Sequence, residues 1–344
     1  MRNIHIHASN AYRVSIGPGI LDQVGSTVCQ CTSAKKVCIV SDENVWPIYG
    51  QTVSASIQQV GPEICSFVFP AAENSKSSYN YLQLLNFLAQ NQFTRSDCIL
   101  ALGGGVVGDL AGFAAATYLR GIPYIQVPTT LLAMVDSSVG GKTGIDLDYG
   151  KNLVGAFYQP AAVLCDTNAL STLPTEVFRD GCAEVIKYGV LFDQALFAHL
   201  EEKGPDFDRE AVIARCVELK RDAVQADEFD RGQRKLLNLG HTVGHAVEKC
   251  SSYAISHGNA VAVGMAIVSR AAGCRDAGQI VSLLEQFGLP VKTVFSAVQL
   301  AQAALSDKKR SGSRLDLIIP HGIGDCRITP TAIEDLQAFI EKGL

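Results

Sequence analysis

The sequence lacks the features of an exported, membrane or nucleic-acid-binding protein. Its net charge of −5 leaves no basic excess to neutralise phosphates. No apolar run reaches the roughly 20 residues that span a bilayer, and residues 4–7 alternate like a strand instead of forming a signal peptide. The eleven cysteines include no C-x-x-C pair and lie mostly in apolar runs, which indicates reduced core thiols in a cytoplasmic protein. We therefore expect neither nucleic acid nor a membrane as a partner.

The chain has the composition and length of a two-domain globular protein. Its 344 residues are 47% apolar and 18% charged. Up to about residue 170, β-rich segments alternate with helical segments, which predicts an α/β domain with a mostly parallel sheet at residues 1–170. Beyond that point the pattern is helical, and strand-like character returns only at 315–319. We therefore predict a mainly α-helical domain at residues 171–344.

A glycine-rich turn follows the apolar segment at residues 98–102. Gly103, Gly105 and Gly108 satisfy G-x-G-x-x-G just before a helical stretch at 110–119. Such a turn presents backbone N–H groups to a pyrophosphate at the positive end of a helix. Two features depart from the ordinary dinucleotide fingerprint: the turn is not in the first βα unit, and no acidic residue follows about 20 positions later. The alternative is a turn that only packs a helix against a strand.

The helical half contains side chains that suit a divalent metal. Glu184 and Lys187 lie three apart on one helix face, His241 and His245 lie four apart on another, and His257 follows in a turn. Imidazoles and a carboxylate are the ligands of a catalytic zinc with an open position. Spacing alone selects His241 and His245, yet a threonine stands where a zincin has its glutamate. A packed or surface histidine pair is the alternative.

The longest distinctive stretch, residues 127–143, continues into residues 150–157. It mixes lysines, an aspartate, an asparagine and hydroxyl groups with glycines. Such groups can hold phosphate and sugar hydroxyls without bulky side chains in the way. The stretch therefore predicts a site for an anionic sugar derivative.

With these motifs in this order, the chain resembles the 3-dehydroquinate synthases over nearly its whole length. The resemblance implies an N-terminal NAD-binding α/β domain, a helical C-terminal domain, an active site in the cleft between them, and a homodimer. It rests on seven blocks: GGGVVGDLAGFAAATYLRG (103–121), VPTTLLAMVDSSVGGKTGID (127–146), GKNLVGAFYQP (150–160), AEVIKYG (183–189), LLNLGHTVGHAVE (236–248), HGNAVAVGM (257–265) and DKKRSG (307–312).

The resemblance implies a lyase of the shikimate pathway, which leads to chorismate and the aromatic amino acids. Such an enzyme converts 3-deoxy-D-arabino-heptulosonate 7-phosphate to 3-dehydroquinate and phosphate by transient NAD-dependent oxidation, phosphate elimination, reduction and intramolecular aldol closure. The implied cofactors are NAD and a divalent metal, zinc or cobalt. The alternatives are a sedoheptulose 7-phosphate cyclase or a 2-deoxy-scyllo-inosose synthase, against which Lys220 and Arg234 argue because they supply charge for a substrate carboxylate. An iron-dependent polyol dehydrogenase and a catalytically silent NAD-binding protein are more distant alternatives.

The resemblance also implies roles for individual residues. The metal ligands would be Glu184, His241 and His257, in place of the pair that spacing selects, and His245 would face the leaving phosphate. Arg120 would reach the site of the neighbouring subunit. The implied substrate contacts are Asp136, Lys142, Asn152, Lys187, Lys220, Arg234, Asn238 and one of Lys308 or Lys309. The implied NAD site comprises Asp42, Glu73, Lys76, Gly103, Gly104, Gly105, Val106, Gly108, Asp109, Thr129, Thr130, Lys142, Lys151 and Thr172.

Two positions depart from the family pattern. Where HGEA is usual, the chain has Asn259 in place of the glutamate, so a carboxylate that could orient His257 is an amide here. Residues 174–179 also lack the arginine–glutamate pair often found after the TLP motif. These changes bear on metal affinity and helix packing more than on the activity.

Overall fold

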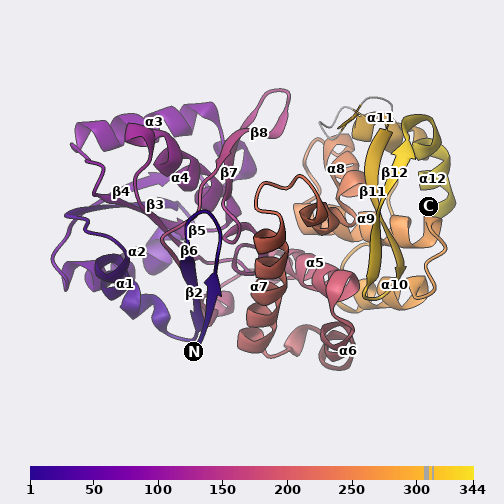
Figure 1. The fold of residues 1–344 in the computed structure, drawn as a ribbon, viewed down its shortest axis with the longest axis horizontal. Helices are drawn as coiled ribbons and strands as arrows, with labels where there is room; N and C mark the ends of the chain where they lie inside the picture. Colours follow the sequence, from indigo (N-terminus) through magenta and orange to yellow (C-terminus); the bar gives the residue numbers. More distant parts are fainter. Residues whose placement is uncertain (306–309, 312–313) are drawn as a thin grey trace. The chain divides into compact units, whose positions relative to one another are not determined.

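The computed structural model describes residues 1–305, 310–311 and 314–344, so the predicted substrate contacts Lys308 and Lys309 lie outside the described residues. The chain forms two compact units, coloured along the sequence in Figure 1. The first unit comprises Met1–Leu173 and Arg209–Phe229. The second comprises Pro174–Asp208 and Asp230–Leu344.

A seven-stranded sheet forms the centre of the first unit, in the order β1-β2-β9-β6-β5-β3-β4. Only β1 runs antiparallel to its neighbour, so the predicted mostly parallel sheet is confirmed. The central strands β5, β6 and β9 are buried along their whole length, as expected for strands covered on both faces. The strands are β1 (Arg2–Ile6), β2 (Tyr12–Gly17), β3 (Lys36–Asp42), β4 (Glu63–Phe69), β5 (Cys98–Gly103), β6 (Tyr124–Pro128) and β9 (Ala162–Asp166).

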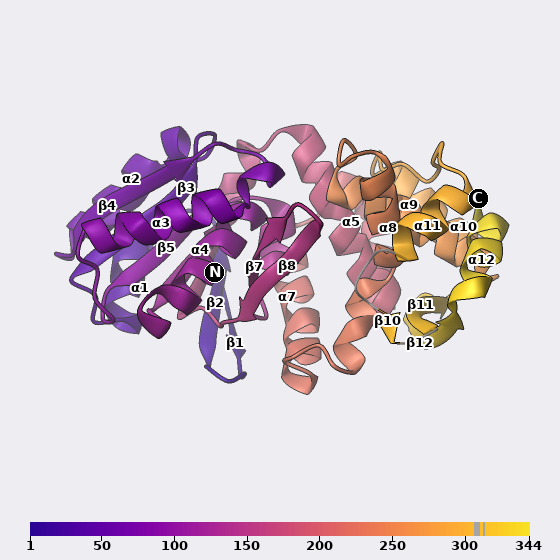
Figure 2. The ribbon, with the colours of Figure 1, turned by 90° about the horizontal axis from the view of Figure 1, so that it is seen from above.

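Helices cover both faces of this sheet (Figure 2). The alternation of β3 shows how the sequence divides between the two faces, because side chains alternate along a strand. Val37 and Ile39 pack with α1 (Val24–Cys31) and α2 (Trp46–Gln58). Cys38 and Val40 belong to the opposite core, which includes α3 (Ser78–Gln90) and α4 (Gly105–Thr117). A hairpin of β7 (Lys142–Leu147) and β8 (Gly150–Phe157) packs against α4.

Helix α7 (Arg209–Ala226) belongs to the first unit, although it follows two helices of the second. It contacts β1, β2 and η4 (Ala133–Ser137). At its C-terminal end, the side chain of Gln225 accepts a hydrogen bond from the backbone N–H of His7 at 2.9 Å. The predicted division between residues 170 and 171 therefore differs from the observed units in this segment. Helical periodicity locates a helix but does not say which body it packs against.

The second unit is mainly helical, as predicted, and carries a small antiparallel sheet of order β10-β11-β12. Strand β11 covers the predicted segment 315–319, whereas the exposed and irregular pattern of β12 gave no strand signal. Helices α8, α9, α11 and α12 share one apolar core with β11. The elements are α5 (Thr175–Phe192), α6 (Gln194–Lys203), α8 (His241–Cys250), α9 (His257–Ala271), α10 (Ala277–Gln286), α11 (Ala297–Leu305), β10 (Arg310–Ser311), β11 (Arg314–Gly322), β12 (Asp325–Ala332) and α12 (Leu336–Gly343).

Short helical turns connect the main elements, and several of them carry predicted site residues. Besides η4, the turns are η1 (Ile20–Gln23), η2 (Glu73–Ser75), η3 (Tyr118–Arg120), η5 (Thr167–Ser171), η6 (Gly204–Asp206), η7 (Gln233–Asn238) and η8 (Ile333–Asp335).

None of the helices in the described part of the chain combines the length and apolar character of a membrane span.

Candidate metal and nucleotide sites

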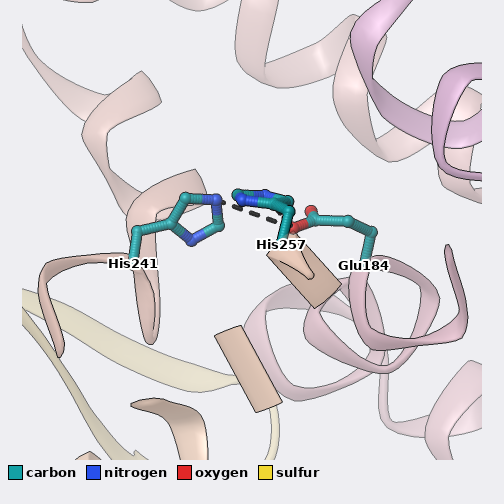
Figure 3. Close-up of side chains that lie close together, drawn as sticks. All are labelled: Glu184, His241 and His257. Carbon is teal, nitrogen blue, oxygen red and sulfur yellow. Dashed lines mark ion pairs between the residues drawn. The ribbon is translucent and has the colours of Figure 1, made fainter. Parts of the chain in front are cut away.

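Three side chains from three helices of the second unit meet in one cluster, which we call the imidazole cluster: Glu184, His241 and His257 (Figure 3). Glu184 Oε1 lies 3.6 Å from His241 Nε2 and 3.5 Å from His257 Nε2. The ligand atoms of the three residues all lie within 4.8 Å of one another. The side chain of Glu184 is 0% exposed. The donor set and its spacing fit a divalent metal.

Glycines next to the two histidines explain how the helices come close enough. Gly240 precedes His241 with a φ of 77°, and a Cβ there would lie 2.7 Å from a side chain of α9. Gly258 follows His257, and a Cβ there would lie 1.9 Å from the backbone oxygen of Asp180 in α5. Neither position accepts a larger residue without a backbone shift. The glycines therefore let α5, α8 and α9 approach where the cluster forms.

Both histidines direct the same nitrogen toward Glu184. His241 Nδ1 lies 3.0 Å from the carbonyl oxygen of Leu239, which can only accept, so Nδ1 carries a proton. In the neutral imidazole, Nε2 then has the lone pair. His257 Nδ1 lies 3.6 Å from Glu248 Oε2, an ion-pair distance. A metal-bound histidine usually has its second nitrogen held in this way by a carbonyl or a carboxylate. The orientation of both rings thus matches that of metal ligands.

The charge around His257 favours a cation. Burial by itself lowers the pKa of His257, but its contacts with Glu184 and Glu248 outweigh burial and raise the pKa to about 10. The carboxylates that hold a proton on this ring would equally attract a metal ion, and metal binding would release the proton. Lys187 adds a second positive group, since its ammonium forms an ion pair with Glu184 and is 1% exposed.

Other predicted substrate residues are divided between the units. Arg234, 1% exposed, and Asn238 lie on η7 in the second unit, where the amide of Asn238 donates to the backbone oxygen of Lys235 at 3.1 Å. Lys220 lies in the first unit, where its ammonium is 2.8 Å from Asp136 Oδ1. The structure therefore joins Lys220 to Asp136, two residues that the resemblance implies as substrate contacts.

His245 lies near the imidazole cluster, but it groups with Glu248 and His257 and not with Glu184. Its ring centroid is 5.5 Å from that of His241 and 6.1 Å from that of His257. With Glu248 and His257 it forms a second group whose ligand atoms lie within 4.8 Å of one another. Spacing alone paired His245 with His241, whereas His257 is the ring that shares Glu184 Oε1 with His241.

In the first unit, the predicted NAD residues follow the carboxyl ends of parallel strands. Asp42 ends β3, Glu73 and Lys76 follow β4, and the glycine-rich turn follows β5. Thr129 and Thr130 follow β6, and Thr172 follows η5 after β9. The chain crosses from β4 back past β3 to β5, so the strand order reverses between β3 and β5. Open α/β sheets bind their ligands at such a reversal, outside the carboxyl ends of the strands.

The glycine-rich turn has the geometry expected for a pyrophosphate site. Strand β5 ends at Gly103, and α4 begins after Gly104, which has an extended backbone and no side chain to cap the helix. A Cβ on Gly104 would lie 3.1 Å from Thr130, and one on Gly108 would lie 2.6 Å from Gln126. Because no side chain caps this helix, the backbone N–H groups of its first turn, which includes Gly105 and Val106, can bind an anion.

A second charged cluster, which we call the lysine cluster, lies beside this turn. Lys76 is 4% exposed, and its ammonium lies 3.2 Å from Glu73, 3.3 Å from Asp109 and 3.6 Å from Asp146. It also donates to Asn152 Oδ1 at 2.8 Å. Burial raises the pKa of Asp109 to about 6, although Lys76 opposes this shift. Burial lowers the pKa of Lys76, but the three carboxylates together raise it above its ordinary value.

Sequence reasoning missed Asp146 in this cluster. Asp146 Oδ1 accepts the backbone N–H of Asn152 at 2.7 Å, and its own N–H donates to the backbone oxygen of Lys76 at 2.7 Å. This bond accompanies a φ of 53° at Asn152, a left-handed conformation that asparagine adopts more readily than most other residues. Nothing in the sequence distinguishes Asp146 from an ordinary polar residue of a hairpin, because its partners lie in another loop.

Four further predicted residues lie elsewhere in the first unit. Asp42 accepts backbone N–H groups of residues 44 and 45 at 2.9 and 3.0 Å, and Lys151 pairs with Glu73 at 3.6 Å. Lys142 is exposed at the start of β7. Arg120 has a φ of 69° and follows Leu119 at 49°. Two successive non-glycine residues in this region mark a strained turn, as often found at functional sites.

Comparison with solved structures defines the class of protein. The fold is similar to a 2-deoxy-scyllo-inosose synthase complexed with carbaglucose-6-phosphate, NAD⁺ and Co²⁺, with a TM-score of 0.89, 25% identity and all of both chains covered. It is also similar to a 2-epi-5-epi-valiolone synthase from Streptomyces hygroscopicus with NAD⁺ and Zn²⁺ bound, with a TM-score of 0.88, 26% identity and 98% of each chain covered. An iron-containing alcohol dehydrogenase, 14% identical with a TM-score of 0.68, shares the fold alone. The class is therefore that of the sugar phosphate cyclases.

Sequence comparison identifies the family within this class. Models described as 3-dehydroquinate synthase N-terminal and C-terminal match residues 66–180 and 181–310. A 3-dehydroquinate synthase of Enterococcus faecalis is 42% identical over 346 residues, with 97% of each chain covered. One of Pelobacter propionicus is 44% identical over 341 residues, with 95% of each covered. The chain belongs to the 3-dehydroquinate synthase family, which confirms the resemblance.

Proposed function

We propose that the protein converts 3-deoxy-D-arabino-heptulosonate 7-phosphate to 3-dehydroquinate and phosphate, using NAD and a divalent metal, zinc or cobalt. The observation that carries this proposal is the imidazole cluster, in which both histidines turn Nε2 toward the buried Glu184. The full-length relatives support the reaction, and the two cyclases solved with NAD⁺ and with Co²⁺ or Zn²⁺ support the cofactors.

The residues of the second unit would act on the reacting carbon centre. When bound, NAD⁺ supplies a hydride acceptor for the C5 alcohol and the metal supplies a Lewis acid for its oxygen. Glu184, His241 and His257 hold the metal in this proposal. Lys187 lies one helical turn from Glu184, so its ammonium would donate to a substrate oxygen beside the imidazole cluster. His245 would face the departing phosphate, which can itself accept the proton removed in the elimination.

The residues of the first unit would bind and orient the dinucleotide. Backbone N–H groups at the start of α4 suit the pyrophosphate. Lys76, Lys151, Glu73 and Asp109 form a polar network around the buried Lys76 at the carboxyl edge of the sheet. A rigid network of this kind holds the reacting atoms in position, so little ordering is needed when the substrate binds. Asn152, fixed in the same network, would then contact the substrate.

The second candidate is a cyclase that acts on a sugar phosphate without a carboxylate. The close fold similarity to 2-deoxy-scyllo-inosose synthase favours it, but the identity of 25% is well below the 42% and 44% shared with 3-dehydroquinate synthases. Arg234 and Lys220 would supply positive charge for the carboxylate that only the heptulosonate carries. A cytoplasmic location and a homodimer, in which Arg120 reaches the neighbouring site, complete the proposal.

Phosphate release tests the proposed function directly. The metal-loaded protein is expected to release phosphate from the heptulosonate phosphate only when NAD⁺ is present, with no net NADH absorbance. Arg234→Ala should reduce this turnover by one to two decades, since each charge-assisted hydrogen bond contributes about 1.5–3 kcal/mol. It should leave any turnover of sedoheptulose 7-phosphate almost unchanged. Faster wild-type turnover of sedoheptulose 7-phosphate, together with an Arg234→Ala variant indifferent to the carboxylate, would establish the second candidate instead.

A further inference from the structure

A buried carboxylate that no predicted role includes lies behind the imidazole cluster. Glu248 is in the last part of α8 and is 2% exposed. Its Oε2 atom lies 3.6 Å from His257 Nδ1, on the side of the ring opposite to Glu184. Burying a carboxylate without a charged or hydrogen-bonding partner is costly. The contact with His257 gives the buried carboxylate of Glu248 a partner that can carry positive charge.

Asn259 does not supply the carboxylate that is usual at its position. Its side-chain amide donates to Ser256 Oγ at 2.9 Å, and its backbone N–H donates to Asp180 Oδ1 at 3.0 Å. These bonds fasten the loop before α9 but do not involve the ring of His257. A different carboxylate, from a different helix, meets that ring at Nδ1.

The two nitrogens of His257 face two carboxylates with different surroundings. Nε2 points to Glu184 and so to the side shared with His241, while Nδ1 points to Glu248. A neutral imidazole has one N–H and one lone pair. If Nδ1–H is held by Glu248, the lone pair on Nε2 is directed into the imidazole cluster. The opposite tautomer would place an N–H where a metal needs a ligand.

We propose that Glu248 positions His257 for metal binding. This inference rests on the proposed function, because it assumes that His257 is a metal ligand. Glu248 does not touch the metal or the substrate. It fixes the tautomer and the direction of the ring, as carboxylates behind metal-bound histidines do.

A second metal ion is the competing explanation for Glu248. His245, Glu248 and His257 also bring ligand atoms within 4.8 Å of one another. However, this group shares His257 with the imidazole cluster, and a ligand nitrogen must be free of its proton. Two ions on one ring would require the loss of both ring protons. One ion, with Glu248 as the acceptor for Nδ1–H, avoids that cost.

Metal affinity of the metal-free protein tests this role without depending on turnover. We expect Glu248→Gln to bind Zn²⁺ and Co²⁺ about 10- to 100-fold more weakly in chelator competition. Glu248→Asp keeps the charge but shortens the side chain, so its metal affinity should lie between that of Glu248→Gln and that of wild type. Glu285→Gln, an exposed position on α10, controls for the loss of one charge in the same unit.

Four outcomes overturn the inference. Equal metal affinity of Glu248→Gln and wild type would show that Glu248 has no positioning role. Two ions bound to wild type and one to Glu248→Gln would make Glu248 a ligand of a second ion. If wild type shows no metal binding that depends on His257, the proposed metal site fails together with the inference. NAD⁺ affinity and the melting temperature of the metal-free variants should match wild type, and a parallel loss of both would indicate a structural role instead.

Discussion

The lysine cluster and the imidazole cluster both place carboxylates next to positive or basic groups, but they differ in the source of the positive charge. In the lysine cluster, Lys76 balances three carboxylates within 3.6 Å, and its ammonium has no lone pair to offer a metal. In the imidazole cluster, Glu184 faces Lys187 and two imidazoles, which can exchange a proton for a metal ion. The comparison shows that a permanent cation makes a closed network, whereas imidazoles leave a place for an external cation.

Removing one imidazole should have the largest effect of the changes considered, because it removes a ligand that the lysine cluster does not have. We expect His257→Ala to lose the metal and to reduce phosphate release by roughly 1000-fold, which corresponds to about 4 kcal/mol of transition-state stabilisation. Elemental analysis and the phosphate assay measure the two effects. His245→Ala should keep the metal and slow the reaction. Full metal occupancy with normal turnover in His257→Ala would reject the triad.

Adding metal should stabilise the second unit alone. A ligand that binds only the folded state adds about 2.7 kcal/mol at 100 times its dissociation constant. Zn²⁺ titration of the metal-free wild type should therefore raise its melting temperature, and the same titration of His257→Ala should not. Lys76→Met should respond to Zn²⁺ as wild type does. An equal loss of the Zn²⁺ response in Lys76→Met would show that the lysine cluster also holds the ion.

Replacing the permanent cation should weaken NAD binding without affecting the metal. Lys76→Met removes a charge-assisted donor and leaves Glu73, Asp109 and Asp146 without their shared partner. We expect NAD⁺ affinity to fall about 10- to 100-fold, the equivalent of about 1.5–3 kcal/mol. Isothermal titration with NAD⁺ measures this, and the metal content should stay at the wild-type level. Unchanged NAD⁺ affinity would remove Lys76 from the proposed site.

The smallest effect concerns pH. Because burial raises the pKa of Asp109 from 3.8 to about 6, the folded protein binds this proton more tightly than the unfolded chain. Asp109 therefore contributes stability below its unfolded pKa, and this contribution is lost as the pH rises through 6. In urea unfolding, the free energy of unfolding of Asp109→Asn relative to that of wild type should rise by on the order of 1 kcal/mol between about pH 5 and pH 7. The exposed Asp148→Asn should show the pH dependence of wild type. The same pH dependence in Asp109→Asn would contradict the raised pKa of Asp109.

The order of secondary structure and the main motifs could be predicted from the sequence. Alternating apolar segments predicted the parallel sheet, and the glycine spacing after residues 98–102 located the turn between β5 and α4. These features depend on local propensity and periodicity, which neighbouring residues carry. The family resemblance, rather than spacing, selected His257 over His245, and the shared contact with Glu184 agrees with that choice.

Only the tertiary structure showed the partners of these residues. Helix α7 joins the first unit, Asp146 supports Asn152, and Glu248 meets His257, although nothing in the local pattern marks these contacts. Periodicity tells which face of an element is buried but not which element covers it. Gly240 and Gly258 are present in the sequence, yet their effect depends on the backbones of α9 and α5 lying against them. The sequence by itself determined the elements and the family, and packing between distant segments decided which side chains meet.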